Sequence, residues 1–468
     1  MNEAREEAFS VEGKRVTVVG AARSGIAAAE LLARRGATVT LSDARSSIEE
    51  DARQRLTAAG VELELGGHVA STFERADLIV MSPGVPPELP AVARARAAGV
   101  QVIGEIELAF RWLAGRVIAV TGTKGKSTTT ALIGRMLDRA GFVVSVGGNI
   151  GAPVSAQVEA STAETLHVIE VSSFQLEQIE RFRPWVAVML NFSPDHLDRH
   201  RTVEAYAAAK ARVFENQQSD DFAVVNADDQ PAMQLASSTK AARRLFSRRS
   251  ALGDGTVIEN GWIVRRSGER AERLVPLKGI RLLGEHLVDD VMAAATVAEI
   301  AGAQADAMTA AVETFGGLEH AMELVADFEG VRFVNDSKAT NVEAAVRSIE
   351  SFRSGVVAIV GGRFKGGDLR LLRTPIGGRG KAVIAIGEAR DLVRRALEDV
   401  IEVRDAQTMD EAVRIGFELA RPSGVVVLAP ASASFDMFRD YAERGERFKD
   451  AVHRLVEARG PLERNGEE

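Results

Sequence analysis

A glycine-rich stretch next to a lysine and a serine gives the sequence its clearest chemical signal. Gly122 and Gly125 come shortly before Lys126 and Ser127. The glycines let backbone N–H groups approach an anion, while the lysine reaches a terminal phosphate and the hydroxyl ligates Mg²⁺. The longer phosphate-loop pattern is incomplete, because Val120 stands where its first glycine belongs. The stretch predicts a nucleotide site, with an ordinary strand-to-helix turn as the alternative.

Oxygen-bearing and imidazole side chains follow two later apolar runs. Glu170 closes one run, and His196 lies in the loop after the next. If both runs are strands of one parallel sheet, their carboxyl ends meet at the edge where Ser127 also lies. Carboxylate and hydroxyl oxygens are the ligands that Mg²⁺ prefers. His196 alone would favour a turn-stabilising role, but the three residues together predict a magnesium site.

Lys210 lies among alanines in a helix predicted over 203–216. A lysine in such a helix usually runs along the surface with its ammonium group in water. The alternative is a side chain turned inward toward the metal region. Periodicity does not decide between these two orientations.

The elements that must position these residues follow from apolar runs separated by helical patterns. A strand over 117–121 enters the glycine-rich loop, and a helix from 127 to about 140 leaves it. Earlier, strands over 15–19 and 38–43 flank a helix, in the manner of a dinucleotide fold. Ala22 replaces the middle glycine of that motif, so we expect a phosphate or nucleotide site without NAD. Asp43, at a strand's end, is either a ribose or base acceptor or a turn residue.

Four further apolar runs near 331–335, 356–361, 382–387 and 425–429 predict a third parallel sheet covered on both faces. The fold class is therefore α/β, with three tandem domains. We expect a Rossmann-like domain over 1–114, a central P-loop ATPase-like parallel sheet over 115–317, and a C-terminal Rossmann-like domain over 318–468.

Composition excludes several classes of protein. The 468 residues carry a formal net charge of -8 and no cysteine, so there is no basic footprint for nucleic acid and no disulfide or thiolate metal site. The N-terminus has no signal-peptide pattern, and no apolar run reaches the roughly 18 residues of a membrane span. We expect a cytoplasmic globular protein.

Five short motifs occur in order along the chain. They are Thr121 to Thr128, Gly148 to Gly151, Glu170 to Leu176, Asp195 to Arg199, and Asn335 to Asn341. Together they resemble the Mur ligases, and the resemblance covers essentially the whole chain. Three runs favour the D-glutamate-adding members, namely Asp336 to Asn341, Gly361 to Asp368 and Ser432 to Phe438.

The resemblance implies an ATP-dependent, amide-forming ligase of peptidoglycan synthesis, with Mg²⁺ as cofactor. Its substrates would be UDP-N-acetylmuramoyl-L-alanine and D-glutamate. A carboxylate is a poor electrophile, so ATP would first convert the muropeptide carboxylate into an acyl phosphate. The amine of D-glutamate would then displace phosphate. We expect the protein to act as a monomer.

The resemblance also implies roles for individual residues. The catalytic positions would be Lys126, Glu170, His196 and Lys210, and the metal ligands Ser127, Glu170, His196 and a carbamylated Lys210. ATP would contact Gly122, Thr123, Lys124, Gly125, Lys126, Ser127, Thr128, Asp336 and Lys338. The UDP substrate would contact Asp43, Arg45, Ser82, Gly84, Asn149 and Ser172, and D-glutamate would contact Thr340, Lys365, Ser434 and Tyr441. Because Asp336 and Lys338 belong to the third domain, catalysis would require domain closure.

The sequence departs from the family pattern in the nucleotide pocket. The family usually has asparagine where Lys124, Leu287 and Asp290 stand, and arginine where Ala321 stands. An arginine on a transferring phosphoryl group is worth roughly a thousandfold or more in rate. Lys124 supplies a cation that offsets this loss in our hypothesis. The alternative functions are a Mur-type ligase for another amino acid, or a weakened or non-catalytic UDP-muropeptide binder.

Overall fold

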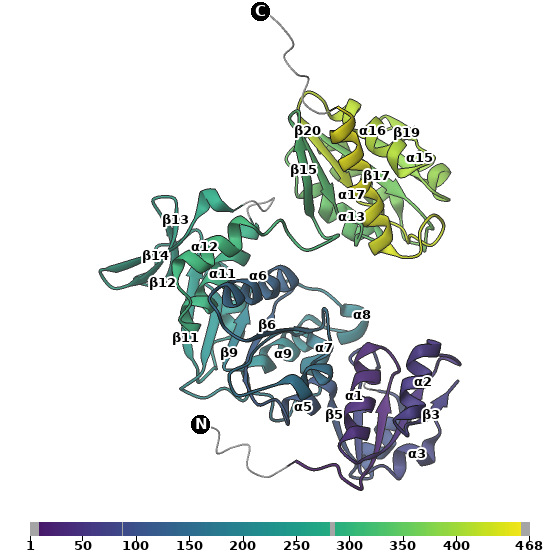
Figure 1. Ribbon diagram of the computed structural model, residues 1–468, viewed down its shortest axis with the longest axis vertical. Coiled ribbons are helices and arrows are strands. Elements are labelled where there is room, and N and C mark those ends of the chain that lie inside the picture. The colour runs from purple at the N-terminus through teal and green to yellow at the C-terminus, as the bar shows by residue number, and fades with distance from the viewer. Residues whose placement is uncertain (1–8, 87, 281–285, 460–468) are drawn as a thin grey trace, which may run out of the picture. The chain divides into compact units, whose positions relative to one another are not determined.

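The computed structural model describes residues 9–86, 88–280 and 286–459, and their strands form three sheets (Figure 1). The chain divides into two compact units. One unit lies within Met1–Ile280 and Val288–Glu313, and the other within Arg281–Leu287 and Thr314–Glu468. Each unit has apolar clusters of its own. The α/β class is confirmed.

The first sheet is parallel, with strand order β3-β2-β1-β4-β5. Its strands are β1 (Arg15–Val19), β2 (Thr38–Asp43), β3 (Glu62–Leu65), β4 (Leu78–Met81) and β5 (Gln101–Gly104). Its helices are α1 (Arg23–Arg34), α2 (Glu50–Ala58), α3 (Ala70–Glu74), α4 (Pro90–Ala97) and α5 (Glu105–Phe110). Apolar side chains of α1, α2 and α5 pack on one face, and those of α3 and α4 on the other.

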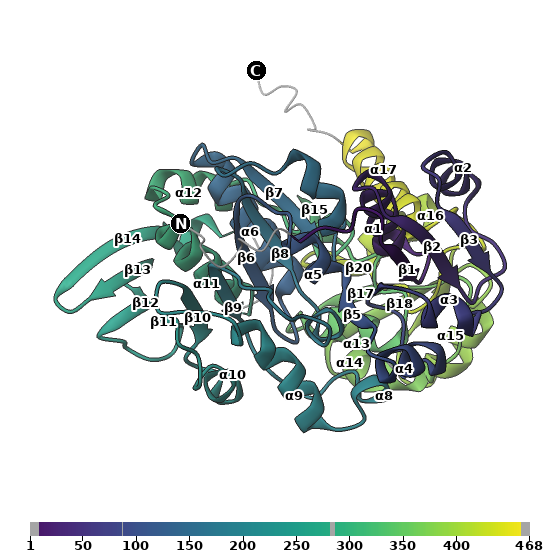
Figure 2. The ribbon, with the colours of Figure 1, turned by 90° about the horizontal axis from the view of Figure 1, so that it is seen from below.

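The second sheet has strand order β14-β13-β12-β11-β10-β9-β6-β8-β7. Its first strands are β6 (Arg116–Thr121), β7 (Val144–Gly148), β8 (Leu166–Glu170) and β9 (Val186–Met189). They are followed by β10 (Phe222–Asn226), β11 (Ala242–Ser247), β12 (Asp254–Glu259), β13 (Trp262–Ser267) and β14 (Arg270–Pro276). The strands from β7 to β12 are parallel, whereas β12, β13 and β14 form an antiparallel ribbon that projects from the sheet (Figures 1 and 2).

Helices connect these strands or follow the last of them. They are α6 (Lys126–Arg139), α7 (Ser173–Leu176), α8 (Leu197–His200), α9 (Val203–Ala211), α10 (Gln230–Leu235), α11 (His286–Ala301) and α12 (Ala305–Glu313). Short 3₁₀ turns occur at η2 (Val154–Ala160), η3 (Arg212–Phe214) and η4 (Leu277–Gly279). The phosphate-loop strand and helix agree with the prediction.

The helix predicted over 203–216 is shorter than expected. Its α-helical part ends at Ala211, and a 3₁₀ turn over Arg212–Phe214 follows. The guanidinium of Arg212 donates hydrogen bonds to the carbonyl groups of Leu176, Glu177 and Ile179 at 2.7 to 2.8 Å. These contacts accompany the tighter turn that replaces the last part of the helix.

The third sheet has strand order β15-β16-β20-β17-β18-β19. Its strands are β15 (Glu323–Phe328), β16 (Val331–Asn335), β17 (Val356–Gly361), β18 (Gly380–Ile386), β19 (Val403–Asp405) and β20 (Gly424–Leu428). Its helices are α13 (Val342–Glu350), η5 (Leu369–Leu372), α14 (Arg373–Arg379), α15 (Arg390–Leu397), α16 (Met409–Ala420) and α17 (Tyr441–Ala458). Side chains of α13, α14 and α15 cover one face, and those of α16 and α17 the other. The edge strand β15 is antiparallel to β16, so the expected parallel sheet carries one antiparallel edge.

Candidate active site

The turn between β6 and α6 has the backbone form that its glycines predict. Gly125 has φ +82°, in the left-handed region, and is the N-cap of α6. A Cβ atom at Gly125 would stand 2.1 Å from Oδ1 of Asp290, so a larger residue does not fit. Oδ1 of Asn191 accepts the N–H groups of Thr123 at 3.1 Å and Lys124 at 2.9 Å, which anchors the loop. The 14-residue helix α6 therefore directs the positive end of its dipole at this loop.

Glu170 joins two of the predicted residues at the end of β8. Its Oε2 accepts a hydrogen bond from Oγ of Ser127 at 2.5 Å, and its Oε1 accepts one from Nδ2 of Asn149 at 2.8 Å. The carboxylate is buried, since Glu170 is 2% exposed. Strands β6, β8 and β7 are adjacent and parallel, so the segments that follow them meet at one edge. A carboxylate and a hydroxyl group are thus held together beside the phosphate loop.

Two lysines, the half-buried Lys126 and the buried Lys210, bind the backbone of this loop. Nζ of Lys126 donates to the carbonyl of Thr123 at 2.9 Å, and burial lowers the pKa of Lys126. Lys210 is 1% exposed, and its Nζ donates to the carbonyl of Gly122 at 2.7 Å. Burial, followed by the charge of Lys126, lowers the pKa of Lys210 to about 7. The inward orientation of Lys210 is therefore the correct one, and much of its amine is neutral at neutral pH.

His196 lies near this cluster but does not join it. Its ring centroid lies 5.1 Å from that of Phe174, and its side chain is 49% exposed. No hydrogen bond or ion pair in the described part of the chain links it to Glu170 or Lys210. The neighbouring His200, which sequence reasoning missed, is buried. Its Nδ1 lies 3.2 Å from Oε1 of Glu177, and nothing in the motif distinguished it from a surface residue.

A cavity of about 540 Å³ lies over the carboxyl ends of the first sheet. It is lined by five of the six residues predicted to contact the UDP substrate, namely Asp43, Arg45, Ser82, Gly84 and Asn149. The sixth, Ser172, does not line the cavity but caps α7, where its Oγ accepts the N–H of Gln175 at 3.3 Å. Gln175, Arg23 and His68 also line it and were not predicted. Of these, Gln175 lies in the motif from Glu170 to Leu176 and Arg23 directly follows Ala22 in the dinucleotide-type motif, so both stand in motifs that could have indicated them.

Asp43 holds Arg45 in place at this cavity. Its two oxygens accept four hydrogen bonds, from the N–H groups of Ala21 and Arg45 and from Nε and Nη2 of Arg45. Burial acts in the opposite direction, but these donors lower the pKa of Asp43 to about 2. The carboxylate is therefore ionised and fully hydrogen-bonded, and it is the half-exposed guanidinium of Arg45 that remains available to a ligand.

In the other unit, the loops after β16, β20 and β17 lie side by side at one edge of the third sheet. The N–H of Ala431 donates to the carbonyl of Ala339 at 3.0 Å, and Arg363 and Ala433 exchange two backbone hydrogen bonds. These loops carry Thr340, Ser434 and Lys365, the predicted D-glutamate contacts. Ser434 is buried, whereas the fourth predicted contact, Tyr441, is 42% exposed.

The two predicted nucleotide contacts of this unit differ in exposure. Asp336 accepts hydrogen bonds from the N–H of Met322 at 3.3 Å and from the hydroxyl of Ser348. Burial raises the pKa of Asp336. Lys338, in contrast, is exposed. The carboxylate is therefore engaged within its own unit, and only the lysine is free to reach outward.

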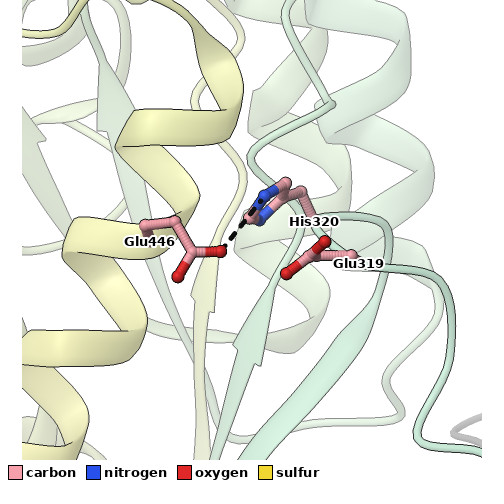
Figure 3. Close-up of side chains that lie close together, drawn as sticks. All are labelled: Glu319, His320 and Glu446. Atoms are coloured by element: carbon pink, nitrogen blue, oxygen red, sulfur yellow. Dashed lines mark ion pairs between the residues drawn. The ribbon is translucent and has the colours of Figure 1, made fainter.

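Glu319, His320 and Glu446 form a second acidic group, with ligand atoms within 4.8 Å of one another (Figure 3). Nζ of Lys449 lies 2.7 Å from Oε1 of Glu319 and 2.8 Å from Oε1 of Glu446. Burial acts in the opposite direction, but these contacts raise the pKa of Lys449, so its single ammonium group is charged and pairs with both carboxylates. We therefore interpret this group as an ion-pair network and not as a metal site.

Comparison with known proteins finds three matching domains, and each match covers most of the strands of one sheet. Residues 14–104 match a model of the Mur ligase MurD-like N-terminal domain, 120–298 the Mur ligase middle domain, and 320–432 the Mur ligase glutamate ligase domain. A UDP-N-acetylmuramoylalanine--D-glutamate ligase of Acidobacterium capsulatum is 47% identical, over 95% of this chain and 97% of the relative. The chain belongs to the Mur ligase family. A Koribacter versatilis protein of the same name is 44% identical, over 96% of this Mur ligase and 99% of the relative.

The fold of this Mur ligase also occurs in solved structures. The UDP-N-acetylmuramate-alanine ligase of Thermotoga maritima aligns with a TM-score of 0.56 and 17% identity, over 95% of this chain and 100% of that one. Within the described residues, no helix combines the length and hydrophobicity needed to cross a bilayer.

Proposed function

We propose that this Mur ligase joins D-glutamate to UDP-N-acetylmuramoyl-L-alanine with consumption of ATP, as a step of peptidoglycan synthesis. The observation that carries this function is the 47% identity to a protein named for that reaction, which extends over nearly the full length of both chains. Mur ligases are ATP-dependent, amide-forming ligases that generally require Mg²⁺. Here the activated acid would be the carboxylate of UDP-N-acetylmuramoyl-L-alanine, and the attacking amine would be that of D-glutamate.

The cavity on the first sheet is the proposed site of the UDP group. Arg45 would meet the negative charge or the polar edge of the nucleotide, with its orientation fixed by Asp43. Ser82 and Gly84 line the same cavity, and Asn149 lies between it and Glu170. The muropeptide would thus extend from the cavity toward the phosphate loop, where its terminal carboxylate has to be phosphorylated. Ser172, which caps α7, stays a proposed contact of the muropeptide part of the substrate.

ATP would bind at the phosphate loop, over Gly122, Thr123, Lys124, Gly125, Lys126, Ser127 and Thr128. The loop N–H groups, the N-terminus of α6 and the ammonium of Lys126 are cationic or donor groups that suit a polyphosphate. Asp336 and Lys338 are the proposed nucleotide contacts in the C-terminal unit. The side chain of Lys338 is the more exposed of the two.

The donor set at the end of β8 fits a hard divalent cation. Ser127 and Glu170 would hold Mg²⁺ through oxygen atoms, and His196 is a further proposed ligand that would have to approach from its exposed loop. Mg²⁺, when bound, neutralises charge on the phosphate groups. As an ammonium group Lys210 does not fit, but its lowered pKa makes the neutral amine available to CO₂. The amine would add to CO₂ and lose a proton, giving an anionic carbamate.

D-glutamate would bind in the C-terminal unit, at the loops that carry Thr340, Lys365 and Ser434, with Tyr441 beside them. A dicarboxylate needs a cation and hydroxyl donors, and these residues supply both. We also propose domain boundaries near residues 114 and 317, which would give each of the three substrates its own sheet.

Measurement of phosphate release tests this function directly. Purified protein with UDP-N-acetylmuramoyl-L-alanine, ATP and Mg²⁺ should release phosphate rapidly only when D-glutamate is added, and mass spectrometry should find the amide product. A panel of other amino acids tests the alternative substrate. If no mixture gives product while the UDP substrate still raises the melting temperature, the non-catalytic binder suggested by Leu287, Asp290 and Ala321 is correct instead.

A further inference from the structure

Arg444 is a fully buried arginine whose charge has no carboxylate partner. It lies in the first turn of α17 and is 0% exposed. Its Nε donates to Oγ of Ser337 at 2.9 Å, its Nη2 to the carbonyl of Ser337 at 2.8 Å, and its Nη1 to the carbonyl of Ser432 at 3.0 Å. No acidic oxygen in the described part of the chain lies within ion-pair distance of it. All three acceptors are therefore neutral.

A buried, unpaired cation is costly, so its position needs a reason. Burial lowers the pKa of Arg444 to about 10, which leaves the guanidinium charged at neutral pH. The charge of Asp436 acts in the opposite direction and raises this pKa, but Asp436 does not form an ion pair with Arg444. The guanidinium thus has no direct ion-pair partner among the described residues.

The guanidinium lies where three loops meet. Ser337 belongs to the loop after β16, and Ser432 to the loop after β20. The loop after β17 also reaches it, because a Cβ atom at Gly362 would stand 3.3 Å from Nη1 of Arg444 and 2.2 Å from the carbonyl oxygen of Ala433. Glycine is required there, so the loop packs as closely as the backbone allows.

Each of these loops carries one proposed D-glutamate contact. Thr340 follows Ser337 by three residues, Lys365 follows Gly362 by three, and Ser434 follows Ser432 by two. A rigid planar group with several donors fixes the distance between the loops more firmly than a single hydrogen bond does. A guanidinium without an ion-pair partner is thus bonded to the loops where a dicarboxylate is expected to bind.

We propose that Arg444 is a positioning residue of the D-glutamate site, which sets the separation of the three loops and supplies an unpaired positive charge that favours a dicarboxylate. This inference rests on the proposed function, since it assumes that D-glutamate binds at these loops. It concerns a residue that does not itself touch the substrate. Substitution of Arg444 should therefore raise the KM for D-glutamate and leave those for ATP and the UDP substrate nearly unchanged.

Steady-state kinetics of Arg444→Lys and Arg444→Met separate geometry from charge. Lysine keeps the charge but not the three-way contact, so the KM for D-glutamate should rise about tenfold, while the KM values for ATP and the UDP substrate stay within about twofold. Methionine also removes the charge, so the KM for D-glutamate should rise roughly tenfold further. Arg447→Met, on the exposed side of the same helix, is the matched control and should change none of the three KM values.

Ser337→Ala provides a milder variant in case Arg444→Met fails to fold. It removes the hydroxyl that accepts from Nε of Arg444 and donates to the carbonyl of Tyr441 at 2.7 Å, and it should raise the KM for D-glutamate selectively. If the variants raise all three KM values together, or lower only the melting temperature, the inference is wrong although the wild type is still a D-glutamate ligase. If the wild-type enzyme shows no dependence on D-glutamate, both the function and the inference fail.

Discussion

At the scale of single residues, burial of Lys210 lowers the pKa of its amine and so bears directly on its proposed role as a carbamylated metal ligand. It is buried beside Lys126, and its amine contacts the phosphate loop. We predict that Lys210→Ala loses at least about a hundredfold in kcat, since a ligand of the proposed metal site is lost. Short carboxylates such as acetate should restore part of the activity, because they replace the carbamate. Acetate added to the wild type serves as the control and should not raise its rate; an alanine variant with full activity would rule out the role.

Asp290 gives a second prediction at this scale, concerning pH and stability. Its carboxyl is buried, Oδ1 accepts from Oγ1 of Thr129 at 3.2 Å, and Oδ2 has no partner among the described residues. Burial raises the pKa of Asp290 well above its usual value, and the nearby Asp289, paired with Arg248, adds to this. A carboxyl whose pKa is raised on folding stabilises the protein fully below its unfolded pKa and loses that stabilisation as pH rises through the folded pKa.

Asp290→Asn should therefore become more stable relative to the wild type as pH rises. The amide cannot ionise, so the variant avoids the cost of a buried charge, which is about 1.4 kcal/mol for every tenfold difference between the folded and unfolded acid dissociation constants. Urea denaturation at pH 5, 7 and 9 measures the difference in unfolding free energy. If the difference in unfolding free energy between Asp290→Asn and the wild type is the same at all three pH values, the carboxyl is not protonated in the folded protein.

At the scale of elements, α5 is joined to the segment before β9 by one carboxylate. Oε2 of Glu107 accepts the N–H groups of Glu180 at 2.8 Å, Arg181 at 3.0 Å and Phe182 at 2.8 Å. Oε1 accepts from Nε of Arg111 at 2.5 Å, and Glu107 is 0% exposed. We predict that Glu107→Ala lowers the unfolding free energy by about 3 kcal/mol or more, because the N–H groups and the arginine lose their acceptor.

Urea denaturation with Glu107→Gln as the matched comparison measures this effect. Glutamine keeps an oxygen for the N–H groups but gives up the charge opposite Arg111, so its loss should be smaller than that of alanine. A loss below about 1 kcal/mol for the alanine variant would mean that water replaces the carboxylate at this junction.

Some of the helices and strands could be predicted from the sequence, and others could not. The strand, loop and helix around Lys126, the strand pair flanking α1, and the family itself were predicted, because glycine positions and apolar periodicity are local signals. The antiparallel direction of β13, β14 and β15 was not predicted, since strand direction depends on which partner pairs with an edge. The inward direction of Lys210 and the contacts of Glu107 were beyond reach for a similar reason: they depend on partners far away in the sequence.

At the scale of the whole molecule, the two compact units have separate cores, so a ligand can stabilise one of them alone. The proposed UDP site is built from residues of the first unit only. A ligand that binds only the folded unit adds RT ln(1 + [L]/Kd) to its stability, which is about 2.7 kcal/mol at one hundred times Kd. Amides that exchange through unfolding of that unit should then be protected about a hundredfold more.

We therefore predict that UDP-N-acetylmuramoyl-L-alanine, added without ATP, slows hydrogen exchange in β1 and β4 by roughly that factor. Amides of β17 and β20, in the other unit, should exchange at their unliganded rates, because their opening does not release the ligand. Hydrogen exchange followed by mass spectrometry resolves the two sets of strands, and Arg45→Ala at the same ligand concentration is the control, which should reduce the protection of β1 and β4. Equal slowing of all four strands would show that the units unfold together, and that the ligand site is not confined to the first of them.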